Sequence, residues 1–520
     1  MVKCTINGID IEVEAGTSVI EAFKQAGQDI AHYCWHPGLS VAGVCRLCMV
    51  EIEGNPRLQI ACNTQVAEGM KVTNQSEMVK DAVKWGLDFH LINHPLDCPI
   101  CDQAGECGLQ DQYMHFGKYD PEMALSKVKK HKVVDLGERV VLDSERCILC
   151  SRCVRFTEEV SKSNELGIFN RGDRSEIGTF DGMPLNNKYS VNTVDICPVG
   201  ALTSKDFRFR QRVWFLKDKP SVCTGCSTGC NIDVYFNKDG VWRVKPHHSD
   251  VNGYWMCDEG RDIYKAVNPI TTDFVGEREN KKAVKKPNRI LSAHSYHDGK
   301  MEFISTAETV SSIELGSFSN PALIVTGQYS NEEYDSILGF WKSKAGGKNI
   351  FHWQNQPEQW QDFDGLLIRG DKNPNTKGLL ASLEKHGLQA QSQLPSMEGF
   401  DFVLVLGPEN QWVYDNISQV ADQVSQAKKV IWLSACHLEK ASQMPKHVTF
   451  VPAKTFVEKS GSFTNFEGKV QSFAMVDVFV EEALDLQQVT QWFAGERVTA
   501  SLAHPWQSVH NEFIHERGEL

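Results

Sequence analysis

The sequence lacks both a long apolar run and an excess of positive charge. Its longest apolar runs, such as residues 402–407 (FVLVLG), are far shorter than the ~18 residues that a membrane-spanning helix needs. Lysine and arginine number 54 against 67 aspartates and glutamates, which gives a formal net charge of −13. We therefore expect neither a membrane-spanning helix nor nucleic acid as the main partner.

The second half of the chain lacks motifs for nucleotide binding and nucleophilic catalysis. Residues 290–520 contain no G-x-G-x-x-G after a strand-like segment, no G-x-x-x-x-G-K-[ST] and no G-x-S-x-G. They also hold a single cysteine, Cys436, whereas 16 of the 17 cysteines precede residue 258. Most of these fall in C-x2-C groups, which in a long chain indicates metal binding rather than a disulfide framework. The chemistry is therefore expected in the first half.

The first cysteine group follows a β-grasp pattern. Alternating strands are predicted at about 2–7 and 9–14, and a helix that Ser18 and Glu21 open as a capping box ends near Gly27. The segments HYCWHPGLSVAGVCRLCMV and IACNT then supply Cys34, Cys45, Cys48 and Cys62. Four thiolates on a loop rich in small residues predict a [2Fe–2S] site, although C-x10-C is longer than the plant-type spacing. A zinc loop is the alternative.

The second group has three cysteines and needs a fourth ligand. Residues 94–107 read HPLDCPICDQAGEC and contain Cys98, Cys101 and Cys107. An amphipathic helix is predicted at 76–93, with Ser76 as its N-cap and Pro95 ending it. This helix delivers His94 towards the cysteines, so we expect His94 to complete a [4Fe–4S] site. The alternative for His94 is a solvent-facing residue at a helix end.

The third group resembles the ligands of a bacterial ferredoxin. RCILCSRC supplies Cys147, Cys150 and Cys153, and the remote DICPVGAL supplies Cys197. A C-x2-C-x2-C run with a distant Cys-Pro predicts one cubane [4Fe–4S] cluster, because Thr157 stands where a two-cluster ferredoxin has its next cysteine. The neighbouring arginines, Arg146, Arg152 and Arg155, either offset the cluster charge or form a solvated surface.

The fourth group leaves two chemistries open. CTGCSTGC and WMCDEGR supply Cys223, Cys226, Cys230 and Cys257, which suit a third [4Fe–4S] cluster or a structural zinc. The three upstream patterns favour the cluster. Cys4 and Cys436 remain and are expected to be buried core thiols.

The second half alternates strand-like and helical segments. Apolar segments ALIVTG, GLLIRG, FVLVLG, VIWLS and VTFVP recur with helical stretches between several of them, after a Lys-rich linker at 281–289. This alternation predicts α/β units around a largely parallel sheet. The loop at 369–378 (RGDKNPNTKG) is expected to be structural.

The order of the four sites resembles the large iron–sulfur subunit (the G subunit) of bacterial respiratory complex I, the NADH:quinone oxidoreductase. The resemblance rests on HPLDCPICDQAGECGLQD, RCILCSRCVRF and DICPVGALTSKDFRF, and more weakly on IRGDKNPNTKGL and KSGSFTNFEGKVQ. It implies an α+β multidomain protein with five domains. These are a β-grasp [2Fe–2S] ferredoxin-type domain at 1–78, a histidine-ligated [4Fe–4S] domain at 79–118, a [4Fe–4S] ferredoxin-like domain at 119–217, a four-cysteine [4Fe–4S] domain of molybdopterin-oxidoreductase type at 218–275 and a shortened α/β scaffold domain at 290–520.

The resemblance also implies an electron carrier without catalytic residues of its own. Electrons from a flavin-bearing, NADH-oxidising partner subunit would enter at the Cys34 site, pass to the Cys147 site and then the His94 site, and leave for other peripheral-arm subunits. Membrane contact would be only through the complex, at the cytoplasmic side of the bacterial inner membrane. No molybdenum cofactor is expected, because the second half is short and lacks a cysteine where molybdopterin enzymes place their metal ligand.

Three other classes share part of this pattern. An [FeFe]-hydrogenase shares the first two modules, but Thr157 and the cysteine-poor second half count against it. A molybdenum formate dehydrogenase shares the last three modules but has a much longer chain. The small diaphorase subunit of an NAD-reducing hydrogenase shares the first three modules and should end near residue 240.

Overall fold

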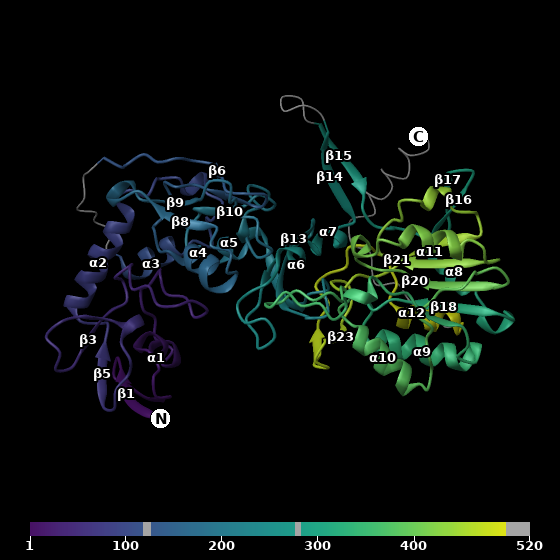
Figure 1. Cartoon of the computed structure of the whole chain (residues 1–520), viewed down its shortest axis with the longest axis horizontal. Coiled ribbons are helices and arrows are strands. Elements are labelled where there is room, and N and C mark those ends of the chain that lie inside the picture. The colour runs from purple at the N-terminus through teal and green to yellow at the C-terminus, as the bar shows by residue number, and fades with distance from the viewer. Residues whose placement is uncertain (118–125, 276–281, 496–520) are drawn as a thin grey trace. The chain divides into compact units, whose positions relative to one another are not determined.

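The computed structural model describes residues 1–117, 126–275 and 282–495 (Figure 1). The chain divides into two compact units, Met1–Leu216 and Lys217–Leu520. The expected boundary between residues 118 and 119 and the last 25 residues of the expected final domain lie outside the described residues.

The first unit opens with the expected β-grasp arrangement. A five-stranded sheet in the order β2-β1-β5-β3-β4 packs with helix α1. Its elements are β1 (Val2–Ile6), β2 (Ile9–Val13), α1 (Val19–Gln25), β3 (Met49–Ile52), β4 (Gln59–Ile60) and β5 (Met70–Thr73). Helix α1 begins where predicted, because the Ser18 hydroxyl accepts from the Glu21 amide and the Glu21 carboxylate accepts from the Ser18 amide.

The rest of the first unit is made of short elements around the cysteine loops. The predicted amphipathic helix is α2 (Glu77–Leu91), capped by the Ser76 hydroxyl, with Val83 and Leu87 buried and Phe89 exposed. The remaining elements are α3 (Gly108–Phe116), β6 (Val134–Asp135), β7 (Val140–Leu142), α4 (Arg152–Arg155), a π-helical turn (Phe156–Val160), β8 (Leu166–Phe169), β9 (Glu176–Thr179), α5 (Asn192–Asp195) and β10 (Leu202–Ser204).

The second unit is built around a seven-stranded sheet in the order β17-β16-β22-β21-β20-β18-β19. Its elements are β11 (Lys217–Val222), β12 (Asn231–Asn237), β13 (Gly240–Pro246), α6 (Asp258–Asp262), α7 (Tyr264–Val267), β14 (Ile270–Val275), β15 (Lys282–Pro287), β16 (His294–His297), β17 (Lys300–Phe303), α8 (Thr306–Ser311), β18 (Pro321–Val325), α9 (Asn331–Ala345), β19 (Ile350–His352), α10 (Thr376–Lys385), β20 (Phe402–Leu406), α11 (Ile417–Val424), β21 (Val430–Ser434), β22 (Val448–Pro452), β23 (Gly461–Thr464), β24 (Val470–Phe473) and α12 (Leu486–Phe493).

The parallel strands β19, β18, β20, β21 and β22 are buried on both faces. In β18, Leu323 belongs to one apolar cluster, which includes side chains of α9, α10 and α12, while Ile324 belongs to another with side chains of α11. Successive strand residues point to opposite faces, so helices on both sides explain the unbroken apolar run of each strand. Figure 1 shows α9 and α10 together on one side of this sheet. The α/β prediction for this half is confirmed.

Two local predictions for the second half are wrong. The expected linker at 281–289 contains β15, which pairs antiparallel with β14 in a hairpin. The expected strand at 365–370 (GLLIRG) is a turn, because one Asp364 carboxylate oxygen accepts from the amides of Leu366, Leu367 and Ile368 at 2.9–3.0 Å. Within the described residues, no helix is long and apolar enough to cross a membrane.

Candidate metal centres

The first site lies in a buried loop of the β-grasp fold. The structure brings together the side chains of Cys34, Cys45, Cys48 and Cys62, all at most 5% exposed. A hydrogen bond from the Cys45 thiol lowers the pKa of Cys34 to about 5, and one from Cys48 lowers the pKa of Cys62. The backbone amide of Tyr33 donates to the Cys45 sulfur at 3.5 Å. The two thiol hydrogen bonds, together with burial, raise the pKa of Cys45 and of Cys48, so four thiolates here would need the positive charge of a metal centre.

The second site is a cavity of about 500 Å³ at the end of α2. His94, Cys98, Cys101 and Cys107 all line it. The buried Nδ1 atom of His94 has no hydrogen-bond partner among the described residues. Burial, together with the cations Lys127 and Arg146, lowers the pKa of His94 to about 4. The imidazole is therefore neutral at pH 7 and has a nitrogen free to bind metal, which fits a ligand and not a solvent-facing helix end.

Residues outside the motif also contact this site. Gly200, three residues after Cys197, is one of them, and a Cβ atom there would lie 2.3 Å from the Cys101 sulfur. The Arg212 guanidinium donates to the carbonyls of Cys101 and Pro99 at 2.6 and 2.7 Å. No sequence pattern indicated either residue, because only the folded chain brings the segments that follow Cys197 against the second cysteine group.

The third site has two buried cysteines, Cys150 and Cys153, and two half-buried ones, Cys147 and Cys197. The structure brings the side chains of Cys147, Cys150, Cys153 and Cys197 together. Burial raises the pKa of Cys147 to about 12 and that of Cys150 to about 11. Thiolates at such a site need a positive partner, which the iron of a cluster supplies.

The arginines around the third site are not a solvated surface. Arg146 is 4% exposed and its guanidinium contacts the carboxylates of Asp97 at 2.9 Å and Asp143 at 3.3 Å. Arg155 is 8% exposed and Arg152 is partly buried. Of the two roles considered for these residues, the structure therefore excludes the surface one.

The fourth site is held by the α/β domain of the second unit. Cys223, Cys226, Cys230 and Cys257 come together and line one small pocket with Lys372. Lys372 pairs with Glu259 at 2.7 Å and belongs to the loop expected to be only structural. A Cβ atom on Gly260 would lie 3.1 Å from the Cys223 sulfur, so the chain approaches this site closely.

Loops that follow β19 and β20, together with strand β24, bind the cysteine loop directly. The Asn410 side chain, after β20, donates to the Thr224 carbonyl at 3.1 Å, and the Gln471 side chain donates to the Gly229 carbonyl at 2.8 Å. The Ser227 amide donates to the Asp371 carbonyl at 2.9 Å. The α/β domain thus serves as the frame of the fourth site.

Among the described residues, no three or more His, Cys, Asp or Glu side chains are arranged to hold a single metal ion. A cubane cluster makes a different geometric demand, because each thiolate bonds its own iron. Cys4 and Cys436 are buried, as predicted.

Family models match most of the cysteine-bearing half. A "2Fe-2S iron-sulfur cluster binding domain" matches residues 1–77, an "NADH-ubiquinone oxidoreductase-G iron-sulfur binding region" matches 86–121, an "NADH-quinone oxidoreductase subunit 3, ferredoxin-like domain" matches 137–203 and a "Molybdopterin oxidoreductase Fe4S4 domain" matches 216–269. The iron–sulfur half of this chain is homologous to the G subunit of NADH-quinone oxidoreductase.

Curated relatives carry the same name. The Rickettsia felis relative, named as the G subunit of NADH-quinone oxidoreductase, is 39% identical over 285 residues, 55% of this chain and 42% of the relative. The Streptomyces coelicolor protein of that name is 42% identical over 54% of this chain and 34% of its own length. The Solanum tuberosum "NADH dehydrogenase [ubiquinone] iron-sulfur protein 1, mitochondrial" is 36% identical over 68% of this chain and 46% of its own length. The chain thus spans less than half the length of these relatives.

A solved structure is also similar. It is a chain of an NAD⁺-reducing [NiFe]-hydrogenase in the H₂-reduced state, 30% identical, covering 41% of this chain and 91% of that chain with a TM-score of 0.37.

Proposed function

We propose that this chain is an electron-relay subunit of an NADH:quinone oxidoreductase of the complex I type. One observation supports it above all others. His94 and the three cysteines of its motif line one cavity, and the buried imidazole nitrogen has no other partner among the described residues. Homology to the G subunit supplies the context in which such a site transfers electrons.

The proposed ligands are the sixteen residues predicted from the motifs. They are Cys34, Cys45, Cys48 and Cys62 for one [2Fe–2S] cluster, and His94, Cys98, Cys101 and Cys107, then Cys147, Cys150, Cys153 and Cys197, then Cys223, Cys226, Cys230 and Cys257 for three [4Fe–4S] clusters. These clusters supply one-electron storage, and the chain's own residues supply their spacing, burial and charge.

Contacts inside the first unit support the proposed order of the sites. The buried Arg155 donates to the carbonyls of Cys34 and Cys150 and so connects their loops. Cys147 and His94 in turn line one cavity of about 260 Å³. The Cys147 site therefore has contacts with both others, which suits an intermediate position between the Cys34 entry and the His94 exit.

The second half is proposed to be a scaffold without a molybdenum cofactor. In an open α/β sheet, ligands bind beyond the carboxyl ends of the strands where the strand order reverses, here between β18 and β20. The Asn410 amide donates to the Gln328 side chain across this point, and the Asn410 side chain holds the Thr224 carbonyl of the cysteine loop. The cysteine loop therefore accepts a hydrogen bond from the sheet's loop at the place where a cofactor would otherwise bind.

The partners and location follow from the proposed role. The flavin-bearing, NADH-oxidising subunit and other peripheral-arm subunits are the proposed partners, at the cytoplasmic side of the bacterial inner membrane. The five-domain division remains a prediction in its boundaries.

Iron and sulfide counting with redox-titrated EPR on anaerobically purified protein tests the proposal. One [2Fe–2S] and three [4Fe–4S] clusters predict about fourteen irons per chain. About ten irons together with one zinc would reassign the Cys223 site to structural zinc. Stoichiometric molybdenum would overturn the scaffold role of the second half.

A further inference from the structure

Two arginines of the third motif contact both the first and the third cysteine groups. Arg152 donates to the carbonyl of Trp35 at 2.6 Å and to that of Ile196, beside Cys197, at 3.1 Å. Arg155 donates to the carbonyl of Cys34 at 2.5 Å and to that of Cys150 at 3.5 Å. Each guanidinium therefore binds a main-chain carbonyl at or beside a predicted ligand of the first site and another at or beside a predicted ligand of the third site.

The loop that contains Cys34 is also bound at Ser40, by residues of α4 and of the π-helical turn that follows it. Arg155 also donates to the Ser40 carbonyl and to the Ser151 hydroxyl, and the Ser40 amide donates to the Glu159 carboxylate at 2.8 Å. The Ser40 hydroxyl donates to Glu159 as well. Residues 34–40 are thus bound to the segment 151–159 by Arg155 and by Glu159. The planar guanidinium of Arg155 has enough donors to bind several of these acceptors simultaneously.

The charges of these side chains lie where they act on both sites. Arg155 is 8% exposed, and buried charges are weakly screened by solvent. The buried Nε atom of Arg152 has no hydrogen-bond partner among the described residues, and donors near cluster sulfurs are one means of setting a reduction potential. Two cations between two thiolate-rich sites favour the reduced, more negative state of each.

We propose that Arg152 and Arg155 are positioning residues of the relay, which fix the separation of the Cys34 and Cys147 sites and raise the reduction potential of both. The inference rests on the proposed function, because it requires clusters at both sites. Electron transfer slows steeply with distance, so a bridge that holds the two loops together sets its rate. The same bridge makes the two potentials respond together to a single substitution.

The test compares Arg155→Met and Arg155→Lys with the exposed-residue control Arg57→Met, all in the full chain. Iron counting first establishes that each protein carries its clusters. Redox-titrated EPR then gives the midpoint potential of each site, and the spin–spin interaction between the two reduced centres reports their separation. The His94 site, in the same unit, serves as an internal reference.

Arg155→Met removes the positive charge and Arg155→Lys keeps it, so the two variants have different expected results. Arg155→Met should lower the potentials of both sites by about 59 mV, a tenfold change in the oxidised-to-reduced ratio of a one-electron couple. Arg155→Lys keeps the charge but cannot serve the carbonyls of Cys34, Ser40 and Cys150 together. It should therefore nearly preserve the potentials and alter the spin–spin interaction.

The negative outcomes separate this inference from the proposed function. Wild-type protein without the two EPR signals overturns the proposed function and the inference together. Intact wild-type signals that do not respond to either Arg155 substitution overturn the inference alone. If Arg155→Met loses iron, the lysine variant decides, and wild-type potentials together with an unchanged spin–spin interaction in Arg155→Lys refute the bridge.

Discussion

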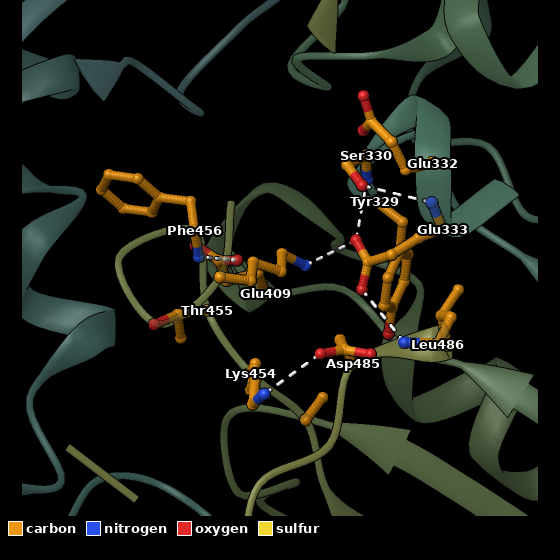
Figure 2. A network of polar contacts seen from close by, with 12 residues as sticks. Tyr329, Ser330, Glu332, Glu333, Glu409, Lys454, Thr455, Phe456, Asp485 and Leu486 are labelled. Carbon is orange, nitrogen blue, oxygen red and sulfur yellow. Dashed lines mark hydrogen bonds and ion pairs between the residues drawn. The ribbon is translucent and has the colours of Figure 1, made fainter. Parts of the chain in front are cut away.

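Replacing Lys459 by methionine should strongly destabilise the second unit. The Lys459 ammonium lies 2.8 Å from the Glu333 carboxylate, and both side chains are 4% exposed. Glu333 also accepts from the backbone amides of Ser330 at 2.9 Å and Leu486 at 3.2 Å, a network shown in Figure 2. This carboxylate therefore links the start of α9 to the start of α12, and Lys459 is the cation that neutralises it.

The expected magnitude follows from leaving a buried charge without its partner. Removing one member of a buried ion pair costs about 3–5 kcal/mol, much more than an exposed pair contributes. At about 2.1 cal/mol/K of unfolding entropy per residue, each kcal/mol lowers the Tm of a unit of about 300 residues by about 1.6 °C, so Lys459→Met should lower the Tm of the second unit by about 5–8 °C. Adding Glu333→Gln should recover part of the loss, because it removes the unpaired charge, although its single amide oxygen can replace only one of the two oxygens that accept from Ser330 and Leu486.

Scanning calorimetry measures this, with Lys440→Met as the matched control. Lys440 pairs with Asp422 at 3.2 Å, but these side chains are 37% and 66% exposed, so the control should cost no more than about 1 kcal/mol. EPR adds a second readout. Destabilisation should weaken the Cys223 signal, while the three sites of the first unit keep theirs. A Tm for Lys459→Met equal to that of Lys440→Met would refute the reasoning.

Three further predictions concern single groups. His94→Cys should keep a cluster but lower its potential, because a thiolate adds the negative charge that a neutral imidazole lacks; an unchanged midpoint in redox-titrated EPR would contradict this. Gly200→Ala should remove iron from the His94 site, because the added Cβ atom would collide with the Cys101 sulfur. The control Gly316→Ala adds a Cβ atom with nothing within 4 Å and should keep the full iron content. Equal iron contents in the two variants would contradict this prediction. Burial raises the pKa of Glu409 from an ordinary 4.5 to about 7, so its folded form binds the proton more tightly than its unfolded form, and stability should fall by about 3 kcal/mol as pH rises from below 4.5 to above 7. Denaturant unfolding at pH 5 and pH 8 should show this fall in the wild type and a flatter response in Glu409→Gln.

The sequence predicted the elements whose causes are local. The capping box at Ser18 and Glu21 and the N-cap at Ser76 depend on residues three positions apart, and the structure has both helices where they were expected. The spacing of Cys147, Cys150 and Cys153 likewise brings their sulfurs together on one short loop. Such features need no knowledge of the rest of the chain.

The failures depend on contacts that are distant or specific to one side chain. Residues 365–370 have the composition of a strand, but the Asp364 carboxylate binds three successive amides and turns the chain. The lysines of 282–287 favour solvent, yet the segment pairs with β14. No sequence pattern marked Gly200 or Arg212 as neighbours of Cys101, because each is about a hundred residues away from it.

Buried cations of this molecule have two kinds of partner, main-chain carbonyls and carboxylates. In the first unit, Arg152 and Arg155 bind the carbonyls beside predicted cluster ligands, so their positive charge faces sites that become more negative on reduction, whereas Arg146 pairs with the carboxylates of Asp97 and Asp143. In the second unit, the buried cations Lys459 and Arg289 bind fixed carboxylates, at 2.8 Å in each case, and so stabilise a fold. Neutralising Arg155 should therefore change reduction potentials in the first unit, and neutralising Lys459 should change the melting temperature of the second unit. A chain built as a relay in one part and as a frame in the other should show this division.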